Sequence, residues 1–320
     1  MMVGVPRALL FHQYGYCWTA FLDAAGFEQV VTAPTTADMV ATGGMRADNE
    51  TCLPVKVFAG HLLDLKGRAD VILVPRVISQ RRGLKACPNY LGLPDLARSF
   101  DRRSPPVLGP VMDLADRKAS WTREWYEMAR DLGAGRQAAI QAVRRMRDVL
   151  SQGREEHAVQ EKPSAAGPTV GIAGHLYNVR DGRVSLGLID RIRDMGASVA
   201  TAERVAVRDL RRELRTLPRK VSWESESTIV GAVLHWSRAA SVDGVIYVSS
   251  FACGPGSMVG ALLEDQLGRE HSVPFMNIVL DEHSAEGGLI TRIEAFLDML
   301  KRVPLRARAA PSAAAEGGLA

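Results

Sequence analysis

Three of the four cysteines stand one or two residues ahead of a proline, in stretches that are otherwise unrelated: "TCLPVK", "KACPNY" and "FACGPG". A proline at this place starts a helix and holds the preceding residue extended. Each cysteine then lies at a helix N-terminus, where the dipole and the unpaired amides favour the thiolate. Proline also removes one backbone donor near the sulfur. The pattern therefore predicts three rigid thiolate ligands for a metal: Cys52, Cys87 and Cys253.

The same residue types leave several interpretations open. Cluster-binding runs of ferredoxins also end in Cys-Pro, which favours an iron–sulfur cluster. Any single cysteine is often just a small buried apolar residue, although the shared proline context makes three such coincidences a weaker explanation. Structural zinc sites show close CxxC pairs, and the sequence has none. The remaining Cys17, on an apolar helical face, is predicted to be a core residue rather than a ligand.

Short apolar runs alternate with helical patterns, which predicts an α/β protein with mainly parallel sheets. Trp18, Phe21, Leu22 and Ala25 share one helical face, and Gly26 suits the C-cap. The patterns predict strands at 2–6, 28–34, 69–75, 105–113, 169–174, 197–203, 243–250 and 274–282. They predict helices at 16–27, 54–67, 185–196, 226–238 and 288–300, two polar helices before residue 150 and one helix after Cys253.

A polar stretch divides the chain. Residues 151–168 have no apolar periodicity and are rich in charged and small residues, which is typical of an exposed linker. We expect it to separate an N-terminal α/β lobe, 1–150, from a C-terminal α/β lobe, 169–304. The tail, 305–320, is predicted to be disordered. The first lobe would carry Cys52 and Cys87, and the second would carry Cys253.

Ligands of open α/β sheets bind beyond the carboxyl ends of the strands. Cys87 and Cys253 each follow a predicted strand by a few residues. We therefore expect two Rossmann-like lobes with the metal site in the cleft between them.

Composition excludes some classes of protein. The chain of 320 residues is 47% hydrophobic and 24% charged, an ordinary globular balance. No apolar run approaches the ~20 residues of a membrane helix, and the start does not read as a secretory signal, so we expect a cytoplasmic protein. The net charge of +4 suits an anionic ligand or partner but does not indicate nucleic acid. The phosphate-loop pattern GxxxxGK[ST], HExxH and GxSxG do not occur.

Polar residues that follow two of the predicted strands are candidates for chemistry. His175, Tyr177 and Asn178 come directly after 169–174, and His175 could move a proton or cap a turn. Glu282 and His283 follow the strand stretch "FMNIVLD" as an acid–imidazole pair, which could move a proton or simply cap the last helix.

Two arginines occur in the same local context. Arg7 and Arg76 each follow a proline after a predicted strand, in the sequence "VPR". The repeated placement indicates anion binding near the cleft, and solvated surface charge is the alternative.

Several stretches carry a resemblance to a known family: "VGVPRALLFHQYGYCW", "NETCLPVKVFAGHLLDLK", "CPNYLGLPDL", "FACGPGS" and "DEHSAEGGLITRIEAFLDML". Together they resemble the acyl-CoA dehydratase activase-related family, which is similar to the iron–sulfur component of 2-hydroxyacyl-CoA dehydratases and to double-cubane cluster proteins. The resemblance implies a [4Fe–4S] cluster, or a larger double-cubane cluster, on Cys52, Cys87 and Cys253. The fourth iron would be left for substrate, solvent or a bridge to another cluster.

The resemblance also implies a redox function. A separate ATP-dependent activase would supply low-potential electrons, and the protein would reduce or dehydrate a small substrate, alone as a homodimer or with a dehydratase-like partner subunit. Whether it is an enzyme stays open. The alternatives are a non-catalytic electron-transfer or regulatory cluster-binding subunit, and a zinc-stapled nucleotide- or sugar-binding protein. The expected catalytic residues are His175, Glu282 and His283, and the expected cofactor-binding residues are Arg7, Arg76, Tyr177 and Asn178.

Overall fold

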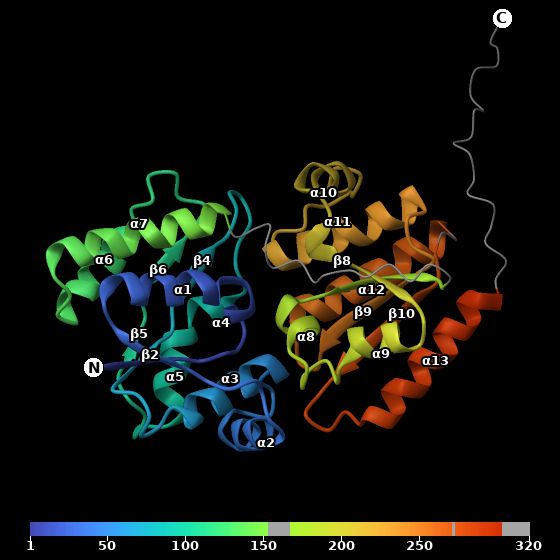
Figure 1. The fold of residues 1–320 in the computed structure, drawn as a ribbon. Coiled ribbons are helices and arrows are strands. Elements are labelled where there is room, and N and C mark those ends of the chain that lie inside the picture. The colour runs from blue at the N-terminus through green and yellow to red at the C-terminus, as the bar shows by residue number, and fades with distance from the viewer. Residues whose placement is uncertain (153–166, 271–272, 303–320) are drawn as a thin grey trace, which may run out of the picture.

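The computed structural model describes residues 1–152, 167–270 and 273–302. Within them, residues 1–152 (the N-terminal half) and residues 167–302 (the C-terminal half) each form a four-stranded sheet, and the two sheets lie side by side in Figure 1. All strand pairs in both sheets are parallel. The α/β class with parallel sheets is therefore confirmed. Most of the predicted linker and all of the predicted tail fall outside the described residues, and the division into two domains stays a prediction.

The N-terminal sheet has the strand order β2-β1-β3-β5. Its central strand β1 is buried from Val3 to Val5, which fits a parallel strand covered on both faces. The strands are β1 (Met2–Val5), β2 (Glu28–Val31), β3 (Val71–Leu73) and β5 (Val107–Leu108). The helices of this half are α1 (Phe11–Ala25), α2 (Ala37–Arg46), α3 (Leu53–Asp64), α4 (Pro88–Leu91), α5 (Leu93–Phe100), α6 (Thr122–Asp131) and α7 (Arg136–Gln152).

Two further strands, β4 (Arg76–Ser79) and β6 (Val111–Asp113), form a parallel pair that continues from β3 and β5. Pro75 and Pro110 stand at the two junctions. Proline has no N–H and cannot donate to a sheet ladder, so each strand is interrupted there. The N–H of Arg76 still donates to the carbonyl of Pro110 at 2.9 Å. The predicted strand 69–75 is therefore the beginning of a longer, broken strand, and the predicted strand 105–113 covers both parts of another.

The C-terminal sheet has the order β10-β9-β7-β8. All seven residues of β9 are buried, as expected for a central strand between two helical layers. The strands are β7 (Thr169–Gly174), β8 (Ser198–Thr201), β9 (Gly244–Ser250) and β10 (Phe275–Leu280). The helices are α8 (Leu176–Arg180), α9 (Leu188–Asp194), the short 3₁₀ helix η1 (Ala202–Arg204), α10 (Val207–Leu214), α11 (Glu224–Ala239), α12 (Gly254–Glu270) and α13 (Glu286–Arg302).

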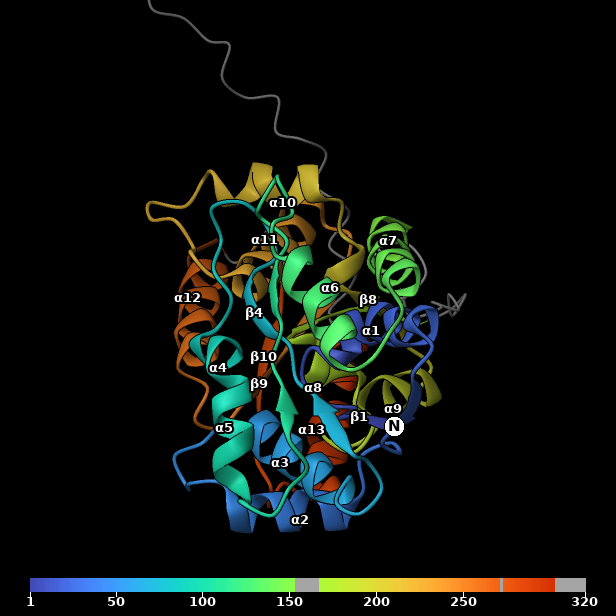
Figure 2. The same ribbon diagram turned by 90° about the vertical axis from the view of Figure 1, so that its left-hand side faces the viewer.

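The apolar core is shared between the halves. One contiguous set of buried residues runs from the N-terminal sheet and α1 into α9, α13 and one face of the C-terminal sheet. A second set, around Tyr247, joins α11 and α12 to the other face of that sheet. Figure 2 shows the N-terminal half in front of the C-terminal half when the molecule is turned by 90°. Among the described residues, no helix combines the length and apolar composition that a membrane span requires.

Four α-helices were not predicted from the sequence: α2, α5, α8 and α10. Glycine obscured α2, because Gly43 and Gly44 weaken a helical pattern. The glycines serve close packing instead. A Cβ atom on Gly43 would lie 1.9 Å from the carbonyl oxygen of Lys56, and one on Gly60 would lie 1.9 Å from that of Met39. Helices α2 and α3 therefore cross with their backbones in contact, which only glycine permits at these two positions.

A buried polar chain connects the halves. His61 is fully buried on α3, with Nδ1 2.6 Å from Thr32 Oγ1 and Nε2 2.9 Å from Thr35 Oγ1. The Thr35 hydroxyl donates in turn to Asp181, whose other oxygen accepts backbone N–H groups of the C-terminal half. The backbone N–H of Arg7 donates to Thr32 Oγ1. Both nitrogens of the neutral His61 imidazole therefore take part in one continuous chain of hydrogen bonds between the halves.

This chain predicts a specific pH dependence of stability. Burial lowers the pKa of His61 from 6.5 to about 4, although the charge of Asp181 raises it. The unfolded chain therefore takes up a proton near pH 6.5 that the folded chain resists until about pH 4. At 1.36 kcal/mol per unit, the free energy of unfolding should fall by about 3 kcal/mol across that interval from this group alone. Urea unfolding between pH 7 and pH 4 measures it.

The matched variants are His61→Gln and His283→Gln, because His283 is exposed. His61→Gln should flatten the pH profile, and His283→Gln should leave its shape unchanged. Equal profiles for wild type and His61→Gln would contradict the burial argument.

Candidate functional site

The three cysteines that precede prolines all lie at helix N-termini. Cys52 is the N-cap of α3 and Cys87 the N-cap of α4, and both have extended backbone with ψ of 147° and 139°. Cys253 directly precedes α12. In parallel α/β layers, the helices begin at the carboxyl edge of the sheet. This arrangement brings the three residues to the facing edges of the two sheets.

Proline determines which amide reaches each sulfur. In all three segments, the residue that directly follows the proline donates its backbone N–H to the cysteine. The donors are Val55 for Cys52, Asn89 for Cys87 and Gly256 for Cys253. The fit at the last of these is close, because a Cβ atom on Gly256 would lie 3.0 Å from Cys253 Sγ. The proline that recurs in the three segments therefore gives the three sulfurs the same local hydrogen-bonding environment.

The three thiols come from both halves and lie near one another. Negative charge on Cys52 and on Cys87 raises the pKa of Cys253, and charge on Cys52 raises that of Cys87. Such coupling falls off with distance, so the sulfurs lie near one another. Among the described residues, no three His, Cys, Asp or Glu side chains are placed to hold a single metal ion. The thiols are therefore grouped, but they do not converge on one point.

The expectation that the helix N-termini favour thiolates is wrong for the protein without a bound metal. Burial is the largest effect at each thiol and outweighs the backbone hydrogen bonds. It raises the pKa of Cys253 to about 12. A group of three thiolates here needs positive charge from a ligand, which is what a metal provides.

One buried cation lies in this region. Lys56, on the first turn of α3, is 2% exposed, and its charge lowers the pKa of Cys52. Its Nζ lies 2.5 Å from Glu282 Oε1, across the boundary between the halves, and donates to the carbonyl of Asn49 at 3.2 Å. Asn89 Nδ2 lies 3.9 Å from Cys52 Sγ. Glu282, one of the residues predicted to be catalytic, is therefore paired with a buried lysine.

A buried acid–imidazole pair also lies near the thiols. His175 Nε2 lies 3.0 Å from Glu226 Oε1, and the two side chains are each 4% exposed. The charge of Glu226 raises the pKa of both Cys87 and Cys253. The ring of Tyr177 stacks on His175 with centroids 5.1 Å apart, and Tyr90 meets Tyr177 edge to face at 6.4 Å. Two buried aromatic rings thus lie near the cysteines.

Two family models match this chain, and together they cover nearly all of it. One is the CoA enzyme activase uncharacterised domain (DUF2229), which matches residues 2–205, well over half of the 320 residues. The chain belongs to this CoA enzyme activase-associated family. The other is the 2-hydroxyglutaryl-CoA dehydratase D-component, which matches residues 111–300 and includes Cys253. The resemblance seen in the sequence is confirmed.

Other comparisons add little. No curated protein matches the sequence. One similar solved structure is the periplasmic zinc binding protein TroA from Treponema pallidum, at 11% identity over 93% of this chain and 97% of that one, with a TM-score of 0.26. A TM-score this low supports no inference about fold or ligand.

Three other residues that were predicted to be catalytic or to bind a cofactor are Asn178, Arg7 and His283. Asn178 is fully buried, and its Oδ1 accepts a 2.8 Å hydrogen bond from Ser250 at the end of β9. Arg7 lies over the ring of Phe11 at 5.9 Å. His283 is exposed in the turn before α13.

Arg76 is engaged within the N-terminal half. It donates to the carbonyl of Leu91, the last residue of α4, and pairs with Asp95 at 2.8 Å. It therefore supports the short helix that Cys87 caps, and the anion-binding role predicted for it stays a prediction.

Sequence reasoning missed Lys56, Asn89, Tyr90 and Glu226. Two of these carried a signal. Lys56 comes four residues after Cys52, which places it on the same side of the helix, and Asn89 directly follows the Cys-Pro pair. Glu226 carried none, because only the packing of α11 against the other half brings it to the thiols. Cys17 is fully buried in the core, as expected.

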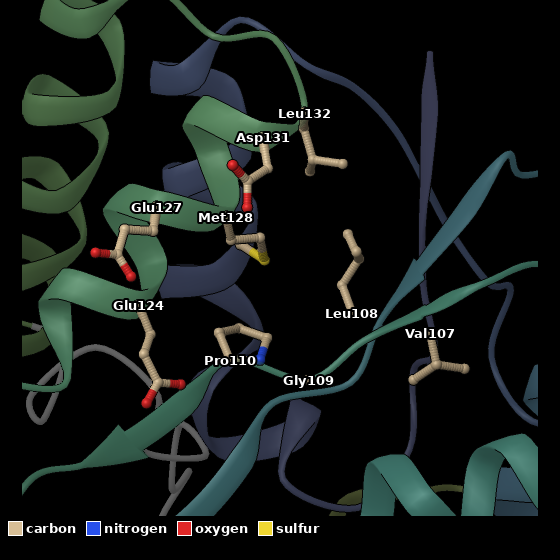
Figure 3. A pocket seen from close by; sticks show the side chains of 9 residues that line it. All are labelled: Val107, Leu108, Gly109, Pro110, Glu124, Glu127, Met128, Asp131 and Leu132. Carbon is tan, nitrogen blue, oxygen red and sulfur yellow. The ribbon is translucent and has the colours of Figure 1, made fainter.

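A pocket of about 350 Å³ lies between α6 and residues 107–110 (Figure 3). Glu124, Glu127 and Asp131 stand around an apolar floor that includes Met128. None of the residues predicted to act in chemistry lines it, so it is separate from the cysteine site.

Proposed function

We propose that Cys52, Cys87 and Cys253 hold a [4Fe–4S] cluster, either alone or as part of a larger double-cubane cluster. The observation that supports this most directly is the repeated arrangement at the three sulfurs. Each lies at a helix N-terminus and each accepts an N–H from the residue after a proline, while the charge of Cys52 acts on Cys87 and the charges of both act on Cys253. Backbone hydrogen bonds to sulfur are a recognised control of cluster potential.

The donor set fits a cluster better than a single zinc ion. Zinc holds its sulfur ligands at about 2.3 Å, so their sulfurs must converge on one point. Among the described residues, no three ligand side chains do so. Thiolates on separate irons of one cluster can stand farther apart. The three cysteines therefore suit an iron–sulfur group more than a zinc staple.

We further propose that the protein is a redox component related to the 2-hydroxyacyl-CoA dehydratases. The match to the 2-hydroxyglutaryl-CoA dehydratase D-component supports this assignment. A separate ATP-dependent activase would supply the electrons, because the sequence has no phosphate-loop motif of its own. The bound cluster would supply one-electron reduction at low potential and, with three protein ligands, a coordination position for a small substrate.

The chain's own residues would control charge and protons around the substrate. The ammonium of Lys56 partly offsets the charge of the thiolates, as its effect on the pKa of Cys52 indicates. Burial raises the pKa of Tyr90 and Tyr177 well above the usual value, so both hydroxyls stay protonated and can donate. His175 presents its Nε2 to the carboxylate of Glu226, which accepts, and this leaves the lone pair on Nδ1.

His175 is therefore the residue we propose to move a proton, at Nδ1, which is buried and has no hydrogen-bond partner among the described residues. Glu282 is proposed to balance Lys56 rather than to act on the substrate. The exposed His283 is the weakest of the three catalytic predictions.

The test is an anaerobic assay. The purified protein is mixed with activase, ATP, a low-potential reductant and a panel of 2-hydroxyacyl-CoA thioesters, and loss of water is followed by mass spectrometry. We expect turnover of at least one thioester, and none with Cys253→Ala. Reduction of the cluster without turnover of any thioester would count against dehydration and in favour of an electron-transfer or regulatory subunit.

A further inference from the structure

A second cavity lies between the two halves. It has a volume of about 990 Å³, at the upper end of the range for small-molecule sites. Its walls come from the start of α1, the loop after β4, the end of α7, α8, η1 with α10, and the start of α11. Both halves therefore contribute to it, as expected for a ligand site.

None of the three cysteines lines this cavity, but α8 and α11 carry residues that lie near each of the two sites. On α8, Leu176 and Arg180 line the cavity, whereas Tyr177 lies near Cys253, whose charge raises its pKa. On α11, Glu224 and Thr228 line the cavity. Glu226 of the same helix instead acts on Cys87 and Cys253. A ligand in the cavity would therefore contact the same two helices that carry residues near the cysteines.

The lining is rich in cations. Its described residues include five arginines against three carboxylates: Arg81, Arg117, Arg147, Arg180 and Arg204 against Asp116, Glu203 and Glu224. One carboxylate is already engaged, because Arg81 pairs with Glu224 and also donates to Thr228 at 2.7 Å. The cavity therefore holds an excess of positive charge.

Arg180 shows this excess most clearly. Its Nε is buried and has no hydrogen-bond partner among the described residues. Burial lowers the pKa of the guanidinium, and the charge of Glu203 only partly opposes this effect. A desolvated cation with too little negative charge near it is stabilised by an anion.

The remaining lining can take a planar ring. Tyr14, Tyr16 and Trp121 line the cavity together with apolar residues such as Leu210 and Ile229. Arginine forms bidentate hydrogen bonds with phosphate, and aromatic side chains stack on bases. A ligand with phosphate groups at one end and a heteroaromatic ring at the other matches both features.

We propose that this cavity binds a nucleoside phosphate, either as a free nucleotide or as the nucleotide portion of a coenzyme A derivative. The proposal does not depend on the cluster, because none of the three cysteines lines the cavity.

Isothermal titration calorimetry tests the proposal on the full-length protein purified anaerobically, with iron measured in the same samples. The probes are ADP, coenzyme A, adenosine and a glutamate-rich peptide. We expect ADP or coenzyme A to bind and adenosine, which lacks phosphate, to bind at least about tenfold more weakly. Tighter binding of coenzyme A than of ADP identifies the coenzyme as the source, and the reverse order identifies a free nucleotide.

The variants are Arg180→Gln and Arg147→Gln, with Arg145→Gln as the matched control. Arg145 is exposed on α7 and projects from the side of the helix opposite to Arg147. The first two should each weaken binding about tenfold, and the control should not change it. The proposal is overturned if neither ADP nor coenzyme A binds, if only the acidic peptide binds, or if all three variants bind like wild type. If the wild-type protein contains no iron but still binds ADP or coenzyme A, the proposed function alone is overturned.

Discussion

Replacing any one of Cys52, Cys87 or Cys253 with alanine is expected to abolish binding of iron and acid-labile sulfide. Each sulfur is one of three grouped thiols, and no other cysteine among the described residues is placed to substitute for it. The loss should therefore be nearly complete at each position rather than partial. Anaerobic purification followed by iron and sulfide analysis and a visible absorption spectrum measures it.

Cys17→Ala is the matched control. Cys17 is fully buried in the core, and burial raises the pKa of its thiol well above the usual value. Its replacement should lower the free energy of unfolding by about 1 kcal/mol and leave iron content unchanged. A stable Cys87→Ala protein with full iron content, or a Cys17→Ala protein without iron, would contradict the assignment. Zinc in place of iron and sulfide in the wild type would also contradict it.

Glu282→Gln is expected to lower the free energy of unfolding by about 3 kcal/mol, although Glu282 is 23% exposed. The reason is its partner: the side chain of Lys56 is 3% exposed, so removal of the carboxylate leaves a buried charge without its counter-ion. Urea unfolding of the purified proteins measures the change. Because the pair crosses between the halves, the variant should also loosen the cysteine site and reduce iron content.

Two further variants separate the pair from a general charge effect. The double variant Lys56→Met with Glu282→Leu removes both charges and should recover most of the stability. Glu286→Gln breaks a more exposed pair with Arg191, in which Glu286 is 54% exposed, and should cost less than about 1 kcal/mol. Equal effects of Glu282→Gln and Glu286→Gln would contradict the role of burial.

The pair also has a predictable pH dependence. Burial raises the pKa of Glu282, but the hydrogen bond and charge of Lys56 outweigh it, and the net pKa lies below the usual 4.5. A carboxylate with a lowered pKa stabilises the fold above the unfolded value, and this stability is lost as the pH falls through the folded value. The stability difference between wild type and Glu282→Gln should therefore be constant above about pH 5 and shrink below pH 4.5.

The sequence by itself determined where the strands of the two four-stranded sheets and most of the helices occur along the chain, and the local setting of each cysteine. Alternating apolar runs identify the strands because parallel strands are buried on both faces, as β9 is along its whole length. Proline after cysteine fixes a helix start because the ring sets φ and removes a donor, and these are local effects. They hold at Cys52, Cys87 and Cys253 alike.

Only the tertiary structure decided which residues meet across the two halves. Lys56 and Glu282 are 226 positions apart, and Glu226 reaches the thiols through the packing of α11. No periodicity encodes such pairs, because they depend on how the carboxyl edges of two sheets face each other. The same is true of ionisation: the helix N-termini favour thiolates locally, but burial raises the pKa of all three thiols. Local chemistry can be read along the chain, whereas desolvation is a property of the folded protein.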